Sequence, residues 1–175
     1  MKSINVIDLD KTLIPFDSFR YLIMSEIKIL NFKIILLVAI RKLRLIRAGT
    51  FKNLVIKVLK LDINSNINQK MVELVLGAID KNILDKVNQE SNDTINILCS
   101  ASANSYVKEV AKRLGWRGYG SYYDGKEFYH MYGANKLKFI QSQFPKNKYQ
   151  YHFAISDSRS DLKLLKEFKK HELII

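Results

Sequence analysis

The sequence predicts an α/β protein whose core is a doubly wound parallel sheet interrupted by an all-helical insertion. Three observations indicate this fold. An apolar strand pattern opens the chain at 3–9, roughly seventy residues of helical pattern follow, and strand and helix patterns then alternate to the end. Since ligands of such sheets bind beyond the carboxyl ends of the strands, we expect the functional residues there.

The first half of the chain contains one strand and the insertion. Residues 3–9 (SINVIDL) are the expected first strand, and Pro15 prevents a helix from following at once. Helical patterns then cover 19–47, 50–61, 68–79 and 82–89. We therefore expect a core of residues 1–15 and 88–175 and a helical cap of residues 16–87.

The second half alternates between strand and helix patterns. The expected elements are a strand at 94–100, a helix at 104–114 ended by Gly115, a hairpin over 118–133, a helix at 134–144, a strand at 149–155, a helix at 161–170 and a strand at 172–175. Asp124 and Gly125 are the expected hairpin turn. Its many aromatic residues suit either cross-strand pairing or base stacking, and we favour pairing.

Composition limits the class of protein. A chain of 175 residues that is 47% hydrophobic can bury one core. The single Cys99 excludes an intramolecular disulfide and a cysteine-rich zinc site, which favours a reducing, cytoplasmic setting. No secretory signal is expected at the N-terminus, and the apolar run at 34–40 is far shorter than the ~20 residues of a spanning helix.

Two aspartates follow the first strand. Asp8 and Asp10 are two positions apart in extended chain, so their carboxylates can point the same way. Carboxylates this close repel, which favours a divalent cation between them. One could attack a substrate while the other transfers a proton. Alone, the pair could equally be solvated aspartates in a turn.

Polar residues also lie at predicted strand ends or helix starts in three further segments. Ser100 ends the strand at 94–100, where a hydroxyl and free backbone N–H groups could hold a phosphate, although it could also be an ordinary N-cap. Lys136 lies at the start of a helix, where a cation suggests a nearby anion. Asp157 and Asp161 bracket a strand-to-helix turn, and such hard oxygen donors suit Mg²⁺.

Taken in order, these motifs resemble the haloacid dehalogenase (HAD) superfamily, in its phosphoserine-phosphatase-like branch with a helical cap. The residues that carry the resemblance are "VIDLDKT", Ser100, Lys136 and "SDSRSD", in the family's order. The resemblance implies a HAD-like, Rossmannoid core. The chain departs from the family pattern at Lys11 and Ser156, where glycine is commoner.

The resemblance also implies a role for each residue. Asp8 would be the nucleophile that forms an aspartyl-phosphate, and Asp10 the general acid and base. Phosphoryl oxygens would bind Ser100, the N–H of Ala101 and Lys136. The implied ligands of Mg²⁺ are Asp8, Asp157 and the backbone carbonyl of Asp10, with Thr12 and Asp161 supporting the site. Because family dehalogenases lack the second acid, Asp10 favours phosphate chemistry.

The cap is basic and apolar. Seven cations and no acid lie between Arg41 and Lys60, and the net charge of +12 favours an anionic partner. "DSF" at 17–19 followed by an aliphatic helix also resembles bacterial phosphatidylglycerophosphate phosphatases. We therefore expect a phosphorylated small molecule or lipid as substrate, and peripheral contact of the cap with an anionic membrane at its inner face is one hypothesis. We favour the simpler interpretation, in which the apolar face packs into the cap and the lysines are solvated.

Two other classes of function remain open. A phospho-accepting receiver domain also combines acids, a hydroxyl and a lysine on such a sheet, but it would leave residues 16–87 unexplained. A nucleic-acid-associated protein, including a polynucleotide end phosphatase, would use the positive charge. No nucleic-acid motif supports this class, and we do not favour it.

Overall fold

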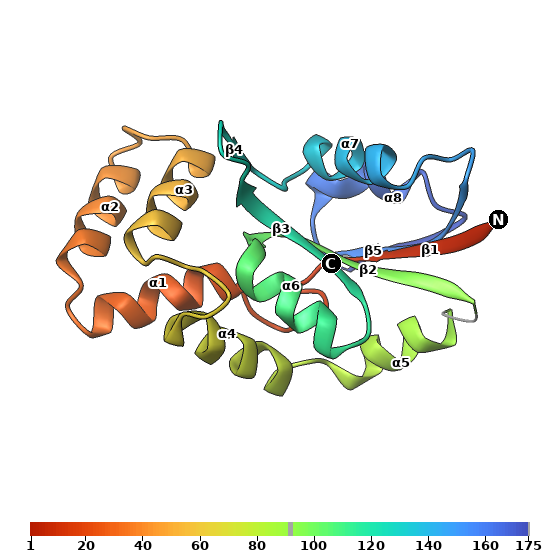
Figure 1. Cartoon of the computed structure of the whole chain (residues 1–175), viewed down its shortest axis with the longest axis horizontal. Helices are drawn as coiled ribbons and strands as arrows, with labels where there is room; N and C mark the ends of the chain where they lie inside the picture. The colour runs from red at the N-terminus through yellow and green to blue at the C-terminus, as the bar shows by residue number, and fades with distance from the viewer. Residues whose placement is uncertain (91–92, 175) are drawn as a thin grey trace.

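The computed structural model describes residues 1–90 and 93–174 (Figure 1). Within these residues six strands form one sheet in the order β4-β3-β2-β1-β5-β6. The strands are β1 (Lys2–Ile7), β2 (Thr94–Ala103), β3 (Arg117–Tyr123), β4 (Phe128–Tyr129), β5 (Tyr149–Ser156) and β6 (Lys170–Leu173). All neighbours pair in parallel except β3 and β4. The predicted parallel α/β fold is confirmed.

Helices cover both faces of the sheet and extend beyond one end of it (Figure 1). They are α1 (Ser18–Lys28), α2 (Phe32–Lys42), α3 (Ala48–Val58), α4 (Asn66–Gly77), α5 (Lys81–Gln89), α6 (Asn104–Arg113), α7 (Ala134–Gln143), the 3₁₀ turn η1 (Arg159–Asp161) and α8 (Leu162–Leu165). Side chains of consecutive residues in a strand are buried on opposite faces of the sheet, as expected for a sheet covered by helices on both faces. Ile7 and Leu98 join the cluster that includes α6, and Val6 and Ile97 join the cluster with α7 and α8.

The predicted helix over 19–47 is wrong, because two helices occupy this segment. Leu30 adopts a positive φ of 56°, which ends α1. Asn31 then caps α2 by accepting a hydrogen bond from the N–H of Ile34 at 3.4 Å. A continuous apolar and basic pattern hid this corner, and the single asparagine was its only sequence signal.

Other boundaries differ from prediction by smaller amounts. The helix expected at 161–170 is shorter: α8 ends at Leu165, and Lys170 already pairs in β6. Position 175 of the expected last strand lies outside the described residues. The hairpin is confirmed, with Gly125 at φ 96° and Tyr122 stacked on Tyr129 across the strands.

The last helix of the predicted cap, α5, lies against the sheet. Lys86 of α5 forms an ion pair of 2.8 Å with Glu172 of β6, and Asn5 of β1 donates to the carbonyl oxygen of Glu90 at 3.0 Å. Another helix of the predicted cap, α4, packs on α6. Division of the chain at residues 15 and 87 into core and cap stays a prediction.

Across 1–90 and 93–174, none of the helices combines the length and apolarity needed to cross a bilayer.

Candidate active site

A pocket of about 300 Å³ lies at the carboxyl ends of β1, β2 and β5. The structure brings seven of the predicted site residues to its wall: Asp8, Asp10, Ser100, Ala101, Lys136, Asp157 and Asp161. The wall is completed by residues that the sequence did not predict for the site: Lys11, Asp17, Lys52, Tyr132, Ser158 and Ser160. Strand ends and helix starts from distant parts of the chain therefore converge on one hollow.

A buried lysine joins two buried carboxylates at the base of the pocket. Lys136 Nζ lies 2.8 Å from Asp8 Oδ1 and 2.7 Å from Asp161 Oδ2. Burial alone opposes the charged lysine, but Asp8 and Asp161 outweigh it and raise the pKa of Lys136. Burial also raises the pKa of Asp8 to about 6, which Lys136 only partly offsets. One cation is therefore shared between two acids, leaving the site short of positive charge.

Asp161 is held by further contacts. Its Oδ2 also accepts from the hydroxyl of Ser156 at 2.9 Å, while its Oδ1 is buried with no hydrogen-bond partner among the described residues. Ser156 is one of the two departures from the family pattern, and its hydroxyl also accepts from the N–H of Ser158. The serine thus fixes the turn that carries Asp161.

Asp10 is oriented by three donors from two elements. The N–H of Ser18 donates to Oδ1 at 2.7 Å, and the hydroxyl of Ser102 donates to Oδ2 at 2.6 Å, with Ser100 more distant at 3.4 Å. The hydroxyls of Ser18 and Tyr106 are 3.0 Å apart. These contacts hold Ser18, the first residue of α1, beside Asp10 at the edge of the catalytic pocket.

The sequence did not predict that Ser102 and Ser18 would contact Asp10. Ser100 and Ser102 are two apart in β2, so strand alternation places both on one side, and this spacing could have pointed to Ser102. Ser18 lies within the "DSF" motif at 17–19, but the motif gave no sign of a contact with Asp10, because a serine after an N-cap aspartate is ordinary.

We expect Ser102→Ala to lower kcat by roughly tenfold. The variant loses a hydrogen bond to a carboxylate, a contact worth about 1.5–3 kcal/mol, and Asp10 would become less well oriented. Steady-state hydrolysis of para-nitrophenyl phosphate would measure the change. Ser105→Ala is the matched control, because the Ser105 hydroxyl is buried without a partner within the described residues. Equal rates for the two variants would contradict this role of Ser102.

The expected position of Ser100 before a helix is wrong. β2 continues to Ala103, and α6 begins only at Asn104. Pairing between β2 and β3 shifts register between Cys99 and Ala103, so the chain bends here while remaining a strand. The hydroxyl of Ser100 accepts a hydrogen bond from the N–H of Ser102 at 3.1 Å. The predicted phosphate-binding position at Ser100 therefore lies within β2 and not at the amino end of α6.

The loop after β1 is tightly constrained. Lys11, the other departure from the family pattern, adopts a positive φ of 56°, a conformation that glycine takes more easily. The hydroxyl of Thr12 accepts from the N–H of Asp157 at 2.9 Å. Thr12 therefore ties the two acidic loops together from behind the pocket.

Lys52 is a further cation in the pocket wall. It comes from α3, donates to the carbonyl oxygen of Ala101 at 2.9 Å, and lies over the Phe19 ring. Burial lowers its pKa, although Asp10 and Asp17 oppose this effect. Because an ammonium group has three N–H donors, Lys52 can bind an anion while it holds Ala101.

The residues present fit a single Mg²⁺ ion. In the described part of the chain, no group of three or more His, Cys, Asp or Glu residues surrounds a common position. The implied set instead uses two carboxylates, Asp8 and Asp157, plus a backbone carbonyl, and Mg²⁺ commonly uses few protein ligands. Burial raises the pKa of Asp157 as it does that of Asp8, so both acids lie where a cation would stabilise their charge.

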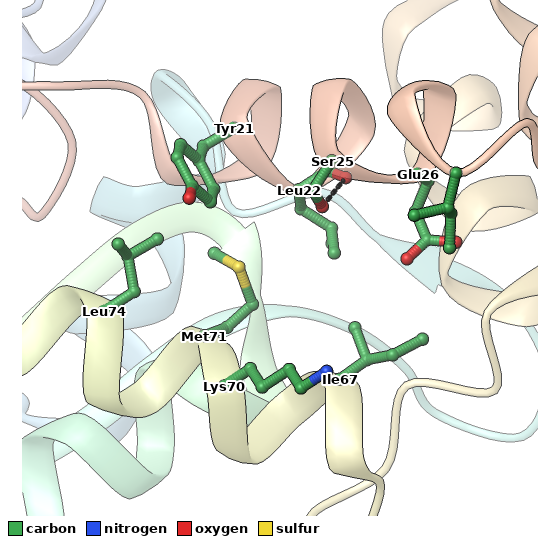
Figure 2. A pocket seen from close by; sticks show the side chains of 9 residues that line it. Tyr21, Leu22, Ser25, Glu26, Ile67, Lys70, Met71 and Leu74 are labelled. Atoms are coloured by element: carbon green, nitrogen blue, oxygen red, sulfur yellow. Dashed lines mark hydrogen bonds between the residues drawn. The ribbon is translucent and has the colours of Figure 1, made fainter.

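A second hollow, of about 420 Å³, lies between α1 and α4 and shares no lining residue with the catalytic pocket. Figure 2 shows Leu22, Met71 and Leu74 on its walls, with Glu26 and Lys70 among them. Glu26 already accepts a hydrogen bond from Asn31 at 2.8 Å. This groove therefore lacks the reactive groups found at the strand ends.

Comparisons with known proteins identify the family and the fold. Residues 6–166 match the family model of the haloacid dehalogenase-like hydrolases. Among curated proteins, no sequence matches significantly.

Several solved structures share the fold. A protein from Bordetella pertussis Tohama I is 13% identical with a TM-score of 0.71, covering 98% of this chain and 89% of that one. A phosphoserine phosphohydrolase-like protein from Francisella tularensis is 16% identical with a TM-score of 0.64, covering 100% and 88%. A phosphoserine phosphatase bearing a phospho-aspartyl intermediate analogue is 13% identical with a TM-score of 0.60, covering 97% and 85%.

Proposed function

The chain belongs to the haloacid dehalogenase-like hydrolases, and from this premise we propose that it is a phosphatase acting on a phosphate monoester. One observation carries the proposal: Asp8 and Asp10 line the same pocket, with Lys136 on Asp8 and two serine donors on Asp10. One acid is thus paired with a cation, and the other is positioned by hydroxyl and amide groups. Such a division suits a nucleophile and a proton carrier.

The reaction would proceed in two steps. Asp8 attacks phosphorus while the bond from phosphorus to the ester oxygen breaks, and Asp10 gives that oxygen a proton. Water then attacks phosphorus while the bond from phosphorus to the Asp8 oxygen breaks, and Asp10 takes a proton from the water. Phosphate leaves and the Asp8 carboxylate is restored. Fold similarity to a phosphoserine phosphatase with a phospho-aspartyl intermediate analogue supports this route. Lys136 and Ser100 line the pocket where phosphoryl oxygens would carry charge.

We expect turnover to require a divalent cation. Mg²⁺ held by Asp8, Asp157 and the carbonyl of Asp10 would supply positive charge to the transferring phosphoryl group. Removing metal with EDTA should abolish hydrolysis of para-nitrophenyl phosphate, and added Mg²⁺ should restore it, while Ca²⁺ should restore it less because it prefers more ligands. Full activity in EDTA would contradict the metal requirement. A Mg²⁺-dependent rise in melting temperature would report binding without turnover.

The pocket wall supports a small, hydrophilic substrate. Apart from Ala101, the lining side chains are charged or hydroxyl-bearing. Lys52 and Asp17 contribute the cap side, where the leaving group would lie. We therefore favour a phosphorylated metabolite with a second charged group over a lipid phosphate whose acyl chains enter the site.

Lys52→Met should raise KM for the natural substrate class by roughly tenfold or more, because a charge-assisted hydrogen bond is lost. It should change hydrolysis of para-nitrophenyl phosphate much less, because that ester has no second anionic group. Lys57→Met on the same helix is the matched control, since Lys57 lies over Tyr123 and does not line the pocket. Equal effects on both esters would show that Lys52 does not select the substrate.

A panel of phosphorylated metabolites, lipid phosphates and 5′-phosphorylated oligonucleotides would test the proposal. Sustained release of phosphate from a small ester is the expected result. A receiver-like protein would take up one phosphoryl group without turnover. Preference for the oligonucleotide, with retention that falls steeply with salt, would favour the nucleic-acid class.

A further inference from the structure

An apolar stripe runs along the outer side of α2. Phe32, Leu36, Ala39 and Leu43 are spaced at i, i+4, i+7 and i+11, which places them on one helix face. All four are exposed, Phe32 by 78%, Leu36 by 62% and Leu43 by 70%. Among the residues of α2, only Ile34 is buried. The helix therefore turns an apolar face to solvent, which the simpler interpretation of the sequence did not predict.

Exposed hydrophobic residues also lie in the loops at both ends of α2. Ile29 and Leu30 precede the helix, and Leu45 follows it, with exposures of 72%, 66% and 70%. Of the twelve exposed large hydrophobic residues in the described chain, six lie within 29–45. We call these residues the cap-end patch: Ile29, Leu30, Phe32, Leu36, Ala39, Leu43 and Leu45. Exposed apolar residues concentrated in this way mark an interaction surface.

The segment that forms the cap-end patch carries cations and no acid. From Ile27 to Leu61 the chain has nine lysines and arginines and no acid. Lys52 is used in the catalytic pocket and Lys57 lies over Tyr123, while five others are exposed near the patch: Lys28, Lys33, Lys42, Arg44 and Arg47. Two copies of such a surface would repel each other, whereas an anionic surface would be attracted.

We propose that the cap-end patch is a docking surface for an anionic lipid bilayer. An interfacial helix of this kind inserts its apolar face at the headgroup boundary, and its cations bind the negative headgroups. In Figure 1, α2 is the outermost helix and α3 lies between it and the sheet. Docking through α2 thus leaves the pocket between α3 and the strand ends free. The surface is independent of the reaction proposed for that pocket.

Vesicle flotation would test the docking surface. The full chain should bind vesicles of phosphatidylcholine with phosphatidylglycerol at low salt, bind pure phosphatidylcholine far less, and dissociate as salt increases. Phe32→Ser/Leu36→Ser should weaken binding by at least about tenfold, because two apolar side chains no longer insert. Lys33→Gln/Arg44→Gln should weaken it by about fivefold per charge.

Matched variants keep the test specific. Ile63→Ser/Tyr123→Ser removes two residues that are each 50% exposed outside the patch, and Lys112→Gln/Lys166→Gln removes two exposed charges elsewhere. Both should bind vesicles as the parent does. All four variants should hydrolyse para-nitrophenyl phosphate at the parental rate, which reports correct folding.

Three outcomes would overturn the proposal. The first is no retention by anionic vesicles at low salt. The second is equal retention of Phe32→Ser/Leu36→Ser, which would indicate adhesion by charge alone. The third is a concentration-dependent dimer in analytical ultracentrifugation that the same variant dissociates, which would assign the patch to a second copy of the chain.

Discussion

Asp8→Asn should lower kcat by at least about 10³-fold while leaving the protein folded. An amide cannot attack phosphorus as a carboxylate does, and removing a nucleophile typically costs this much or more. The substitution preserves side-chain shape, and Lys136 keeps Asp161 as its partner at 2.7 Å. Steady-state hydrolysis of para-nitrophenyl phosphate with Mg²⁺ measures the loss, and circular dichroism with thermal unfolding reports the fold.

Asp85→Asn provides the matched control for this result. Asp85 is an exposed acid on α5, outside the catalytic pocket, so its variant should keep the parental rate. Asp8→Asn protein that retained a tenth of the parental activity would show that another group attacks phosphorus. Rapid uptake of one phosphoryl group without turnover in the parent would instead indicate a phospho-accepting domain.

Lys136→Met should lower the free energy of unfolding by about 3–5 kcal/mol, the usual cost of removing one partner from a buried ion pair. Asp8 and Asp161 would then share a buried site without a cation, and the side chain of Lys136 is only 4% exposed. Urea denaturation followed by circular dichroism measures the change. Activity should also fall, because the transferring phosphoryl group loses a positive charge.

Two further variants make this prediction specific. Lys138→Met removes an exposed lysine from the same helix and should change stability by less than about 0.5 kcal/mol. Lys136→Met/Asp161→Asn should recover part of the lost stability, because one uncompensated carboxylate is gone. An unchanged urea midpoint for Lys136→Met would show that the two acids do not depend on this lysine.

The sequence predicted the fold best where chemistry and periodicity agree. The strand before Asp8, the hairpin turn at Gly125 and the alternation after residue 94 all carry local signals, and the structure has them. The corner at Leu30 carries no glycine or proline, so an apolar pattern continued through it unnoticed. Local patterns find elements well and the breaks between similar helices poorly.

The candidate site could be predicted in part, for a physical reason. Acids and a lysine are conspicuous at strand ends and helix starts, so Asp8, Asp10, Lys136, Asp157 and Asp161 could be singled out. Strand alternation could have placed Ser102 beside Ser100, but not its contact with Asp10, which lies 92 positions away. Lys52 of α3 donates to Ala101, 49 positions away. Such partners depend on tertiary packing, which local spacing encodes only in part.

The contact between Asp8 and Lys136 joins residues that are 128 positions apart, and Asp161 follows 25 positions later. During synthesis on the ribosome, Asp8 therefore emerges long before its counter-charge, and β1 must wait for β5, its neighbour in the sheet. A nascent chain that stops before Lys136 has neither the ion pair nor the completed sheet edge. Hydrolytic capacity thus arises late in translation, and prematurely terminated chains would not acquire it.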